Sequence, residues 1–384
     1  MNSSIYTSTN RIILVDSLRG FALMGLFMVH MVEYFELYWY KPEESIFNEI
    51  SFFFFGGKAF AVFALLFGLS FFIILDNQSE RGIDFRKRFA WRLLLLLFLG
   101  FLHGLIYGGD ILQLLALTGF LLLPIFKAKN YFLLTLAAVF LFQIPAILHI
   151  VFFNISEPPA HWALFGPVLQ AYAEGSFTDL LKTTLWNSQL AKWSFMFESG
   201  RLSTIIGMSI LGFWLGRIHF FKNIKDNLRS KKILFGSFLL LTILLMTQKN
   251  FIYQFINPTG NWFISTVIGN YINLSFIVAG VSGFVLLYQL NYFGKFLSLL
   301  APCGRMSLTI YVSQSLFFVP FFYGFGFGAY DFIGQTASFF LGILFWIIQV
   351  ALAHYWIQKY HFGPLEWVWR SATYLRRDIA FKKA

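Results

Sequence analysis

Charged side chains are scarce in this sequence, and that scarcity sets the first limit on its structure. Asp, Glu, Lys and Arg make up 12% of the 384 residues, against roughly 25% in soluble domains. Hydrophobic residues make up 58% of the chain, and its mean hydropathy is +0.67. A soluble domain of ordinary surface is therefore excluded, and we expect an all-α, polytopic integral membrane helix bundle.

Cysteine and the common catalytic motifs are also missing. The one cysteine, Cys303, excludes an intramolecular disulfide and a cysteine-based metal site. The sequence has no metal-ligand spacing, nucleophile elbow or phosphate-binding glycine loop, so we expect no bound metal. Any reactive group is then expected among the polar side chains inside the membrane. Burying such a side chain in lipid costs free energy, so each one needs a bonding partner or a function.

Long apolar runs fill most of the chain. A helix needs about 20 apolar residues to cross a bilayer core of about 30 Å. The runs predict about ten transmembrane helices, at 12–35, 50–75, 89–108, 111–126, 131–153, 201–220, 233–248, 265–290, 305–327 and 335–358. The fourth and seventh are short, so a pair could be re-entrant. We expect a single transmembrane domain over 1–384, with an extracytoplasmic loop at 154–200 and a basic cytoplasmic tail at 359–384.

The distribution of positive charge predicts the orientation. An even number of spans puts both termini on one side, and most of the 29 Lys and Arg residues then fall on that same side. Positive loops resist translocation, so both the N-terminus and the C-terminus are predicted to be cytoplasmic. The net charge of +11 is explained by topology and by contact with anionic lipid head groups, and we expect no nucleic-acid partner.

The first predicted span carries the densest set of polar residues. Asp16 and Arg19 are three residues apart and can pair on one helix face. Arg19 and His30 are eleven residues apart, close to three whole turns, so they share a stripe and lie about 16 Å apart along the axis. Two interpretations stay open. The residues could act in chemistry, or Asp16 and Arg19 could form a structural ion pair, with His30 and Glu33 solvated at the interface.

A second polar group lies between the third and fourth spans. His103 comes seven residues before Asp110, and Gly108 and Gly109 between them are expected to end the helix. Asp110 falls at about the depth predicted for His30. A carboxylate beside an imidazole fixes its tautomer and raises its basicity, as in acid–base sites. The alternative is that Asp110 is only an N-cap of the next helix.

The ninth span is unusually polar and begins near Arg305. Ser307 and Tyr311 follow on the same helix, and these side chains could line a site or only bond neighbouring helices. Glu198 and Arg201, at the outer end of the sixth span, could pair across the mouth of a cavity.

Several segments together resemble the YeiB-like bacterial membrane proteins, long called domain of unknown function 418. The segments are Asp16-Ser17-Leu18-Arg19-Gly20-Phe21-Ala22, 60–68, Gly109-Asp110-Ile111-Leu112, Gly304-Arg305-Met306-Ser307-Leu308-Thr309 and Gly363-Pro364-Leu365-Glu366-Trp367-Val368-Trp369-Arg370. The similarity covers almost the whole chain. It places the chain beside two groups of membrane acyltransferases, the heparan-glucosaminide N-acetyltransferase group and the acyltransferase-3 group.

The resemblance implies an activity and roles for the polar residues. Acyltransferase-3 proteins carry an Arg-x10-His pattern on the first helix, and Arg19 and His30 match it. The expected reaction moves an acyl group, with acetyl as the first candidate, from cytoplasmic acyl-CoA to a hydroxyl or amine of an extracytoplasmic acceptor such as a cell-envelope glycan. His30, oriented by Asp110 or His103, would be the general base. If His30 does not have this role, His103 with Asp110 would be the base instead.

The same resemblance supplies the remaining expectations. Arg19 and Arg305 would hold the negative groups of acetyl-CoA, and Ser307 and Tyr311 would line its tunnel. The chain would be a multi-pass protein of the bacterial cytoplasmic (inner) membrane, surrounded by lipid, and a homo-oligomer stays open. Two rival functions also stay open: a proton-coupled transporter or flippase that uses the same polar residues as a pathway, and a non-catalytic assembly partner in envelope biogenesis.

Overall fold

The computed structural model describes residues 12–153, 158–222, 228–257, 260–376 and 378–383. Within these ranges the chain is helical, and the β pairing is confined to an isolated bridge between Tyr360 and Lys382. The helices are α1 Ile13–Val32, η2 Leu37–Trp39, α2 Ile46–Phe54, α3 Ala59–Ser79, α4 Arg86–Gly104, α5 Leu112–Leu122, α6 Asn130–Leu141, α7 Ile144–Phe153, α8 Ala160–Glu174, α9 Phe177–Leu185, α10 Asn187–Glu198, α11 Arg201–Arg217, α12 Leu228–Thr247, α13 Lys249–Ile256, α14 Trp262–Tyr288, α15 Asn291–Ser298, α16 Ala301–Arg305, α17 Ser307–Phe322, η3 Ala329–Asp331, α18 Gln335–Lys359 and α19 Pro364–Tyr374.

A helix lies at each of the ten predicted positions, but not every one is long enough to cross a bilayer unaided. In the described ranges five stretches are long and apolar enough: Ile13–Trp39, Ile46–Ser79, Leu228–Thr247, Trp262–Tyr288 and Gln335–Lys359. The pair α6 and α7, bent by 50° at its break, makes a sixth. The helices α5 and α17 are apolar but shorter. The all-helical class is confirmed, and the count of about ten spans stays a prediction.

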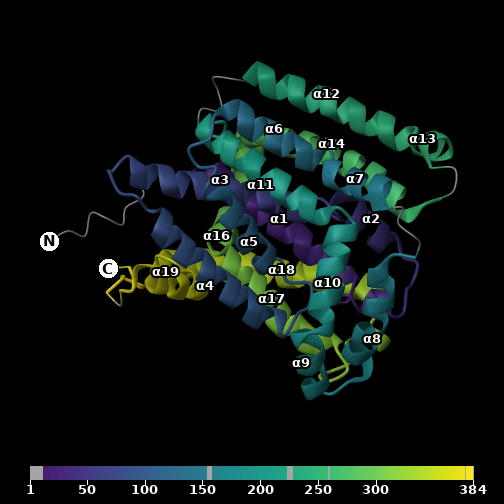
Figure 1. Ribbon diagram of the computed structural model, residues 1–384. Coiled ribbons are helices and arrows are strands. Elements are labelled where there is room, and N and C mark those ends of the chain that lie inside the picture. Colours follow the sequence, from purple (N-terminus) through teal and green to yellow (C-terminus); the bar gives the residue numbers. More distant parts are fainter. Residues whose placement is uncertain (1–11, 154–157, 223–227, 258–259, 377, 384) are drawn as a thin grey trace.

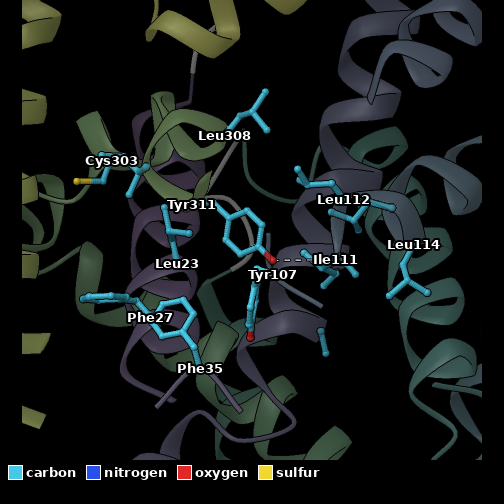
Figure 2. Packing of buried hydrophobic residues seen from close by; sticks show 14 of the residues in the cluster. Leu23, Phe27, Phe35, Tyr107, Ile111, Leu112, Leu114, Cys303, Leu308 and Tyr311 are labelled. Atoms are coloured by element: carbon cyan, nitrogen blue, oxygen red, sulfur yellow. Dashed lines mark hydrogen bonds between the residues drawn. The ribbon is translucent and has the colours of Figure 1, made fainter. Parts of the chain in front are cut away.

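The first helix passes through the middle of the molecule. α1 contacts α3, α16, α17 and α18, so segments from both ends of the chain meet around it (Figure 1). Its buried face packs aromatic side chains against α17, where the rings of Phe27 and Phe318 lie 5.5 Å apart. Figure 2 shows Leu23 and Phe27 of this core close to Tyr107 and Tyr311. The polar residues of α1 are therefore surrounded by protein.

Two glycines bring α3 and α11 into very close contact. A Cβ added at Gly68 would lie 1.8 Å from the carbonyl oxygen of Ser209, and one at Gly212 would lie 1.8 Å from that of Leu65. Helices inside membranes associate by such small residues because lipid offers no hydrophobic drive for association. This contact fixes α11, whose first residue, Arg201, points to the polar centre described below.

The molecule has two distinct ends, occupied by α19 and by α8 with α9 (Figure 1). At the α19 end, Trp91 Nε1 of α4 donates a hydrogen bond to the Ala372 carbonyl, and Trp369 Nε1 of α19 donates to that of Arg92. At the α8 end, the Tyr40 hydroxyl donates to the Glu174 carboxylate. The predicted extracytoplasmic loop 154–200 contains the three helices α8, α9 and α10, while its residues 154–157 lie outside the described ranges.

Much of the outer surface is apolar. α12 lies at the edge of the bundle against α14 (Figure 1), and large side chains such as Ile233, 59% exposed, and Leu240, 58% exposed, point away from the protein. A run of exposed apolar side chains along a 20-residue helix is unstable in water and stable in lipid. The structure is that of a membrane protein.

Candidate functional site

The polar residues of α1 belong to two separate groups, and the first is an arginine clamp made of Asp16, Arg19, Ser70 and Gly304. Arg19 Nη1 donates to Asp16 Oδ1 and to the Gly304 carbonyl, both at 3.2 Å, and Nη2 donates to Ser70 Oγ at 2.5 Å. These contacts join α1 to α3 and α16. A guanidinium engaged by three fixed acceptors positions helices, so the geometry favours the structural interpretation of the Asp16–Arg19 pair over donor binding.

Arg305 and Ser307 lie at the junction of α16 and α17, near the α19 end. Arg305 is the last residue of α16 and Ser307 the first of α17. Glu366 of α19 accepts hydrogen bonds from Leu308 N at 2.7 Å and from Thr309 N and Oγ1 at 3.1 and 2.6 Å. A carboxylate at the start of a helix satisfies free backbone N–H groups and complements the helix dipole. This contact, a latch between α19 and α17, joins the segments 304–309 and 363–370.

The second group is a histidine cluster: His30, His103, Tyr107, Asp110, Tyr311 and Ser315. At its centre, His103 Nδ1 lies 2.8 Å from Asp110 Oδ1, and His103 Nε2 lies 2.5 Å from Ser315 Oγ. The three side chains come from the end of α4, the turn before α5 and the middle of α17. Asp110 is fully buried, and His103 and Ser315 are 4% and 2% exposed.

Asp110 combines the two roles that the sequence left open. Its Oδ1 contacts His103, while its Oδ2 accepts the backbone N–H of Gln113 at 3.1 Å and so caps α5. The carboxylate is thus held by the start of a helix, and it orients the imidazole in turn. With Nδ1–H donating to Asp110, the Nε2 lone pair of His103 faces the Ser315 hydroxyl. That order of groups is nucleophile, base and orienting carboxylate.

His30 joins the cluster through Tyr107, a residue that the sequence analysis did not single out. The Tyr107 hydroxyl and His30 Nδ1 share a hydrogen bond of 2.9 Å, and the two rings meet edge to face with centroids 5.3 Å apart. The Tyr107 ring also lies 6.1 Å from that of His103. The expectation that Asp110 or His103 orients His30 directly is therefore wrong, because Tyr107 lies between the two imidazoles.

Tyr311 completes the cluster from α17. Its hydroxyl accepts the backbone N–H of Ile111 at 3.3 Å, as the dashed line in Figure 2 shows, and its ring lies 5.1 Å from that of His103. Ser307, Tyr311 and Ser315 follow one another at intervals of four residues on α17, and the last two reach Ile111 and His103. The predicted donor-binding residues are thus separated: Arg19, Arg305 and Ser307 lie toward α19, and Tyr311 lies in the histidine cluster.

Four charged side chains, Glu33, Glu36, Lys192 and Arg201, form a charged rim beside the histidine cluster. Arg201 interacts electrostatically with both glutamates and with Tyr107, and Lys192 interacts with Glu36 and Asp110. Lys192 is 3% exposed, and its ammonium has no hydrogen-bond partner among the residues that the structure describes. The rim therefore brings the positive charges of Lys192 and Arg201 close to three carboxylates. These are Glu33 and Glu36 of the rim and Asp110 of the histidine cluster.

A strained turn places Glu36 in this rim. Three consecutive residues, Tyr34, Phe35 and Glu36, have φ of 49°, 52° and 88°, a left-handed region that residues other than glycine rarely adopt. The turn ends α1 and sends Glu36 back toward the α4–α5 turn. There, a Cβ added at Gly109 would lie 2.4 Å from Glu36 Oε1 and 2.4 Å from the Tyr107 hydroxyl. Strain of this kind persists only where surrounding contacts maintain it, and it is frequent at functional sites.

Glu198 does not pair with Arg201, so that expectation is wrong. Its carboxylate accepts the backbone N–H groups of Ala160 and His161 at 3.0 and 3.2 Å, and it lies 2.5 Å from His161 Nδ1. Glu198 therefore caps the start of α8. Among the described residues, no other carboxylate contacts this helix end. Arg201 instead lies over the rings of Phe60 and Phe195, at 5.4 and 4.6 Å. The contacts of Glu198 with α8 and of Arg201 with Phe60 join segments too far apart in sequence for spacing to reveal them.

One cavity lies away from the histidine cluster. It has a volume of about 120 Å³ and lies between α6, α7, α11 and α14, with Glu198, Ser199 and Gly200 at one side. No side chain of the histidine cluster lines it. Among the residues with described positions, no group of three His, Cys, Asp or Glu residues is arranged to hold a metal ion.

Four residues of the histidine cluster and the charged rim were missed by the sequence analysis: Glu36, Tyr107, Lys192 and Ser315. Ser315 could have been found, because it lies four residues beyond Tyr311 on a helix already noted as polar. Lys192 had no comparable signal, since the sequence places it in an extracytoplasmic segment among other scattered charges.

Comparison with known proteins places this chain among uncharacterized relatives. The family model described as protein of unknown function (DUF418) matches residues 215–376. The chain is 28% identical to the uncharacterized protein YxaH of Bacillus subtilis (strain 168), over 100% of this chain and 99% of that protein. It is 26% identical to the uncharacterized 39.9 kDa protein in amylase 3′ region of Bacillus acidopullulyticus, over 97% of both. The uncharacterized protein YeiB of Escherichia coli (strain K12) is 31% identical over 25% of this chain and 24% of its own length. No solved structure matches the chain.

Proposed function

This chain belongs to the DUF418 family, and from the geometry of its histidine cluster we propose that it is a membrane-bound acyltransferase. In the proposed reaction, an acyl group, in the simplest case acetyl, passes from cytoplasmic acyl-CoA to a hydroxyl or amine of an extracytoplasmic acceptor such as a cell-envelope glycan. The observation that carries the proposal is a buried imidazole, His103, held between the Asp110 carboxylate and a hydroxyl.

His103 has the surroundings that a general base needs. The Asp110 carboxylate fixes the tautomer in which Nε2 accepts a proton, and it stabilises the imidazolium that forms. His103 is 4% exposed, so bulk water is kept from a reactive acyl group. His30, bonded to Tyr107 in the same cluster, is the second imidazole within reach of a proton transfer.

The proposed topology brings donor and acceptor to opposite ends of the bundle. We assign the α19 end to the cytoplasm and the α8 end to the outside, with all ten predicted helices crossing the bacterial inner membrane. Arg305 and the basic start of α4 would then meet the phosphates of acyl-CoA, while the arginine clamp fixes the helices beside them. Along α1, Arg19 and His30 are separated by about 16 Å, which is the distance that the thioester arm has to cover.

The test is label transfer from acetyl-CoA radiolabelled in the acetyl group, added to the cytoplasmic side of oriented vesicles. Wild type is compared with His103→Ala and His30→Ala at matched protein levels. A matched control is His354→Ala, because the one hydrogen bond of His354 Nδ1 among the described residues is to the carbonyl of Val350 on its own helix, at 2.9 Å. We expect label in an outside acceptor with wild type and His354→Ala, and a loss of about 10²–10⁴-fold with His103→Ala.

Retained transfer in His103→Ala would refute the assignment of the base. If wild-type protein neither binds nor consumes acyl-CoA, the proposed activity itself fails.

A second function, proton-coupled transport or lipid flipping, is favoured by one observation. The charged rim adjoins the histidine cluster, so titratable groups continue from His103 through Tyr107 to Glu36 and Lys192. A proton pathway needs such a series. Proton movement into vesicles that depends on Glu36 and persists without any acyl donor would support transport. If no such proton movement is measured, proton-coupled transport loses its support and the acyltransferase remains the proposed function.

A further inference from the structure

Ser315 occupies the position that a nucleophile takes in an acyl-transfer site. From this we infer that the transfer runs in two steps through an acyl ester on Ser315, with His103 as its base and Asp110 as the positioning residue. The inference rests on the proposed function and deepens it, because it names the atom that carries the acyl group between donor and acceptor. Direct transfer would need no serine beside the imidazole.

The geometry of the three side chains carries the inference. Ser315 Oγ, His103 and Asp110 follow one another at 2.5 and 2.8 Å, with the oxygens on the two different nitrogens of the ring. Ser315 Oγ also lies 3.2 Å from the Val312 carbonyl and 3.5 Å from that of Tyr311. Those two contacts are longer and are available to any serine in a helix, whereas the series Ser315, His103 and Asp110 requires three separate segments to meet.

The chemistry balances without another reagent. His103 Nε2 takes the proton of the Ser315 hydroxyl as Oγ bonds to the thioester carbonyl carbon. The C–S bond then breaks, and the CoA sulfur leaves as a thiol with the proton from His103. In the second step His103 takes a proton from the acceptor hydroxyl or amine, which attacks the acyl carbon, and Ser315 Oγ recovers its proton as it leaves. The low exposure of all three residues protects the ester from hydrolysis between the two steps.

Position on the fold also suits an intermediate. Ser315 lies near the middle of α17, between Ser307 toward the α19 end and the helix end at Phe322. An acyl group held there is between the donor and acceptor sides of the proposed topology. The side chains of the resting structure cover it, so binding of the donor has to open the cluster.

The experiment is isotope exchange between acetyl-CoA and labelled CoA in the absence of acceptor. Exchange needs an acyl-enzyme and does not need the intermediate to accumulate. We expect exchange with wild type, a loss of at least about 10²-fold with Ser315→Ala, and partial exchange with Ser315→Cys. The matched control is Ser313→Ala, because Ser313 lies on the same helix but its hydroxyl accepts from Gln349 Nε2 of α18, at 3.2 Å.

The outcomes separate this inference from the proposed function. Acyl transfer to acceptor without exchange, or exchange that survives Ser315→Ala, overturns the serine ester and leaves the acyltransferase standing. If wild type uses no acyl-CoA, a fluorophosphonate probe reports on the serine alone. Labelling that is lost with Ser315→Ala and kept with Ser313→Ala then supports an activated serine in another reaction, and absence of labelling overturns it. Thermal unfolding of each variant identifies any that fails to fold.

Discussion

The latch between α19 and α17 offers the sharpest test of the structure, because it can be measured without knowing a substrate. Replacing Glu366 by Ala removes three hydrogen bonds, from Leu308 N, Thr309 N and Thr309 Oγ1. Loss of a helix cap costs about 0.5–2 kcal/mol, and a hydrogen bond to a charged group contributes about 1.5–3 kcal/mol. We therefore expect Glu366→Ala to lower the free energy of unfolding by about 3–5 kcal/mol.

Glu366→Gln is the informative comparison. Its amide oxygen can still accept both backbone N–H groups, and its amide nitrogen can donate to Thr309 Oγ1, so the loss falls to about 1 kcal/mol. Thr309→Val removes the hydroxyl, which also accepts from Leu365 N at 3.1 Å, and should fall between the two. Glu49→Ala, an exposed acid on α2, is the matched control and should change little.

The assay is unfolding of the purified protein in mixed micelles as the fraction of denaturing detergent rises, followed by circular dichroism. Equal losses in Glu366→Ala and Glu366→Gln would show that the latch does not act by satisfying the start of α17. A loss in Glu366→Ala no larger than in Glu49→Ala would refute the reasoning altogether.

Three further predictions concern the helix contacts and the site. Gly109→Ala would press a methyl group on Glu36 and Tyr107, so we expect a loss of about 1–3 kcal/mol in unfolding free energy together with reduced acyl transfer. Gly280→Ala, whose added Cβ meets nothing within 4 Å, should leave both unchanged. In Gly212→Ala the added methyl group would collide with the backbone of α3 instead of a side chain. This variant should therefore lose more thermal stability than Gly109→Ala, and an equal or smaller loss would contradict the close contact between α3 and α11. Asp110→Asn keeps an oxygen for the cap of α5 but reverses the favoured His103 tautomer, so transfer should fall by up to about 10⁴-fold with little change in melting temperature; a parallel loss of both would indicate a structural role only.

The sequence predicted where helices lie better than how long they are. Apolar run length is read directly from residue type, so all ten predicted positions contain a helix. The break between α6 and α7 was not predicted, because it comes from Gln143, whose φ is 56° and whose amide donates to Thr204 of α11 at 3.0 Å. A contact with a distant helix decides that break, and the local sequence contains only the apolar run.

The candidate site was predictable in part for the same reason. His103 and Asp110 are close in sequence, so a turn between them was enough to expect contact. Ser315 reaches His103 across 212 residues of chain, and a periodic hydroxyl stripe does not show which neighbouring helix it faces. Tyr107 and Lys192 depend likewise on how α4, α10 and α11 meet.

The central place of α1 also has a consequence for the order in which the protein is made. α1 leaves the ribosome before the other described helices, yet two of its packing partners, α16 and α18, belong to the last quarter of the sequence. An isolated charge at the centre of a membrane helix costs about 2.5–3.5 kcal/mol on the insertion scale. The Asp16–Arg19 contact lies within α1 itself, so it is available while the helix enters the membrane. Ser70 joins next and Gly304 last, so Arg19 has a counter-charge on its own helix before the bundle closes around it.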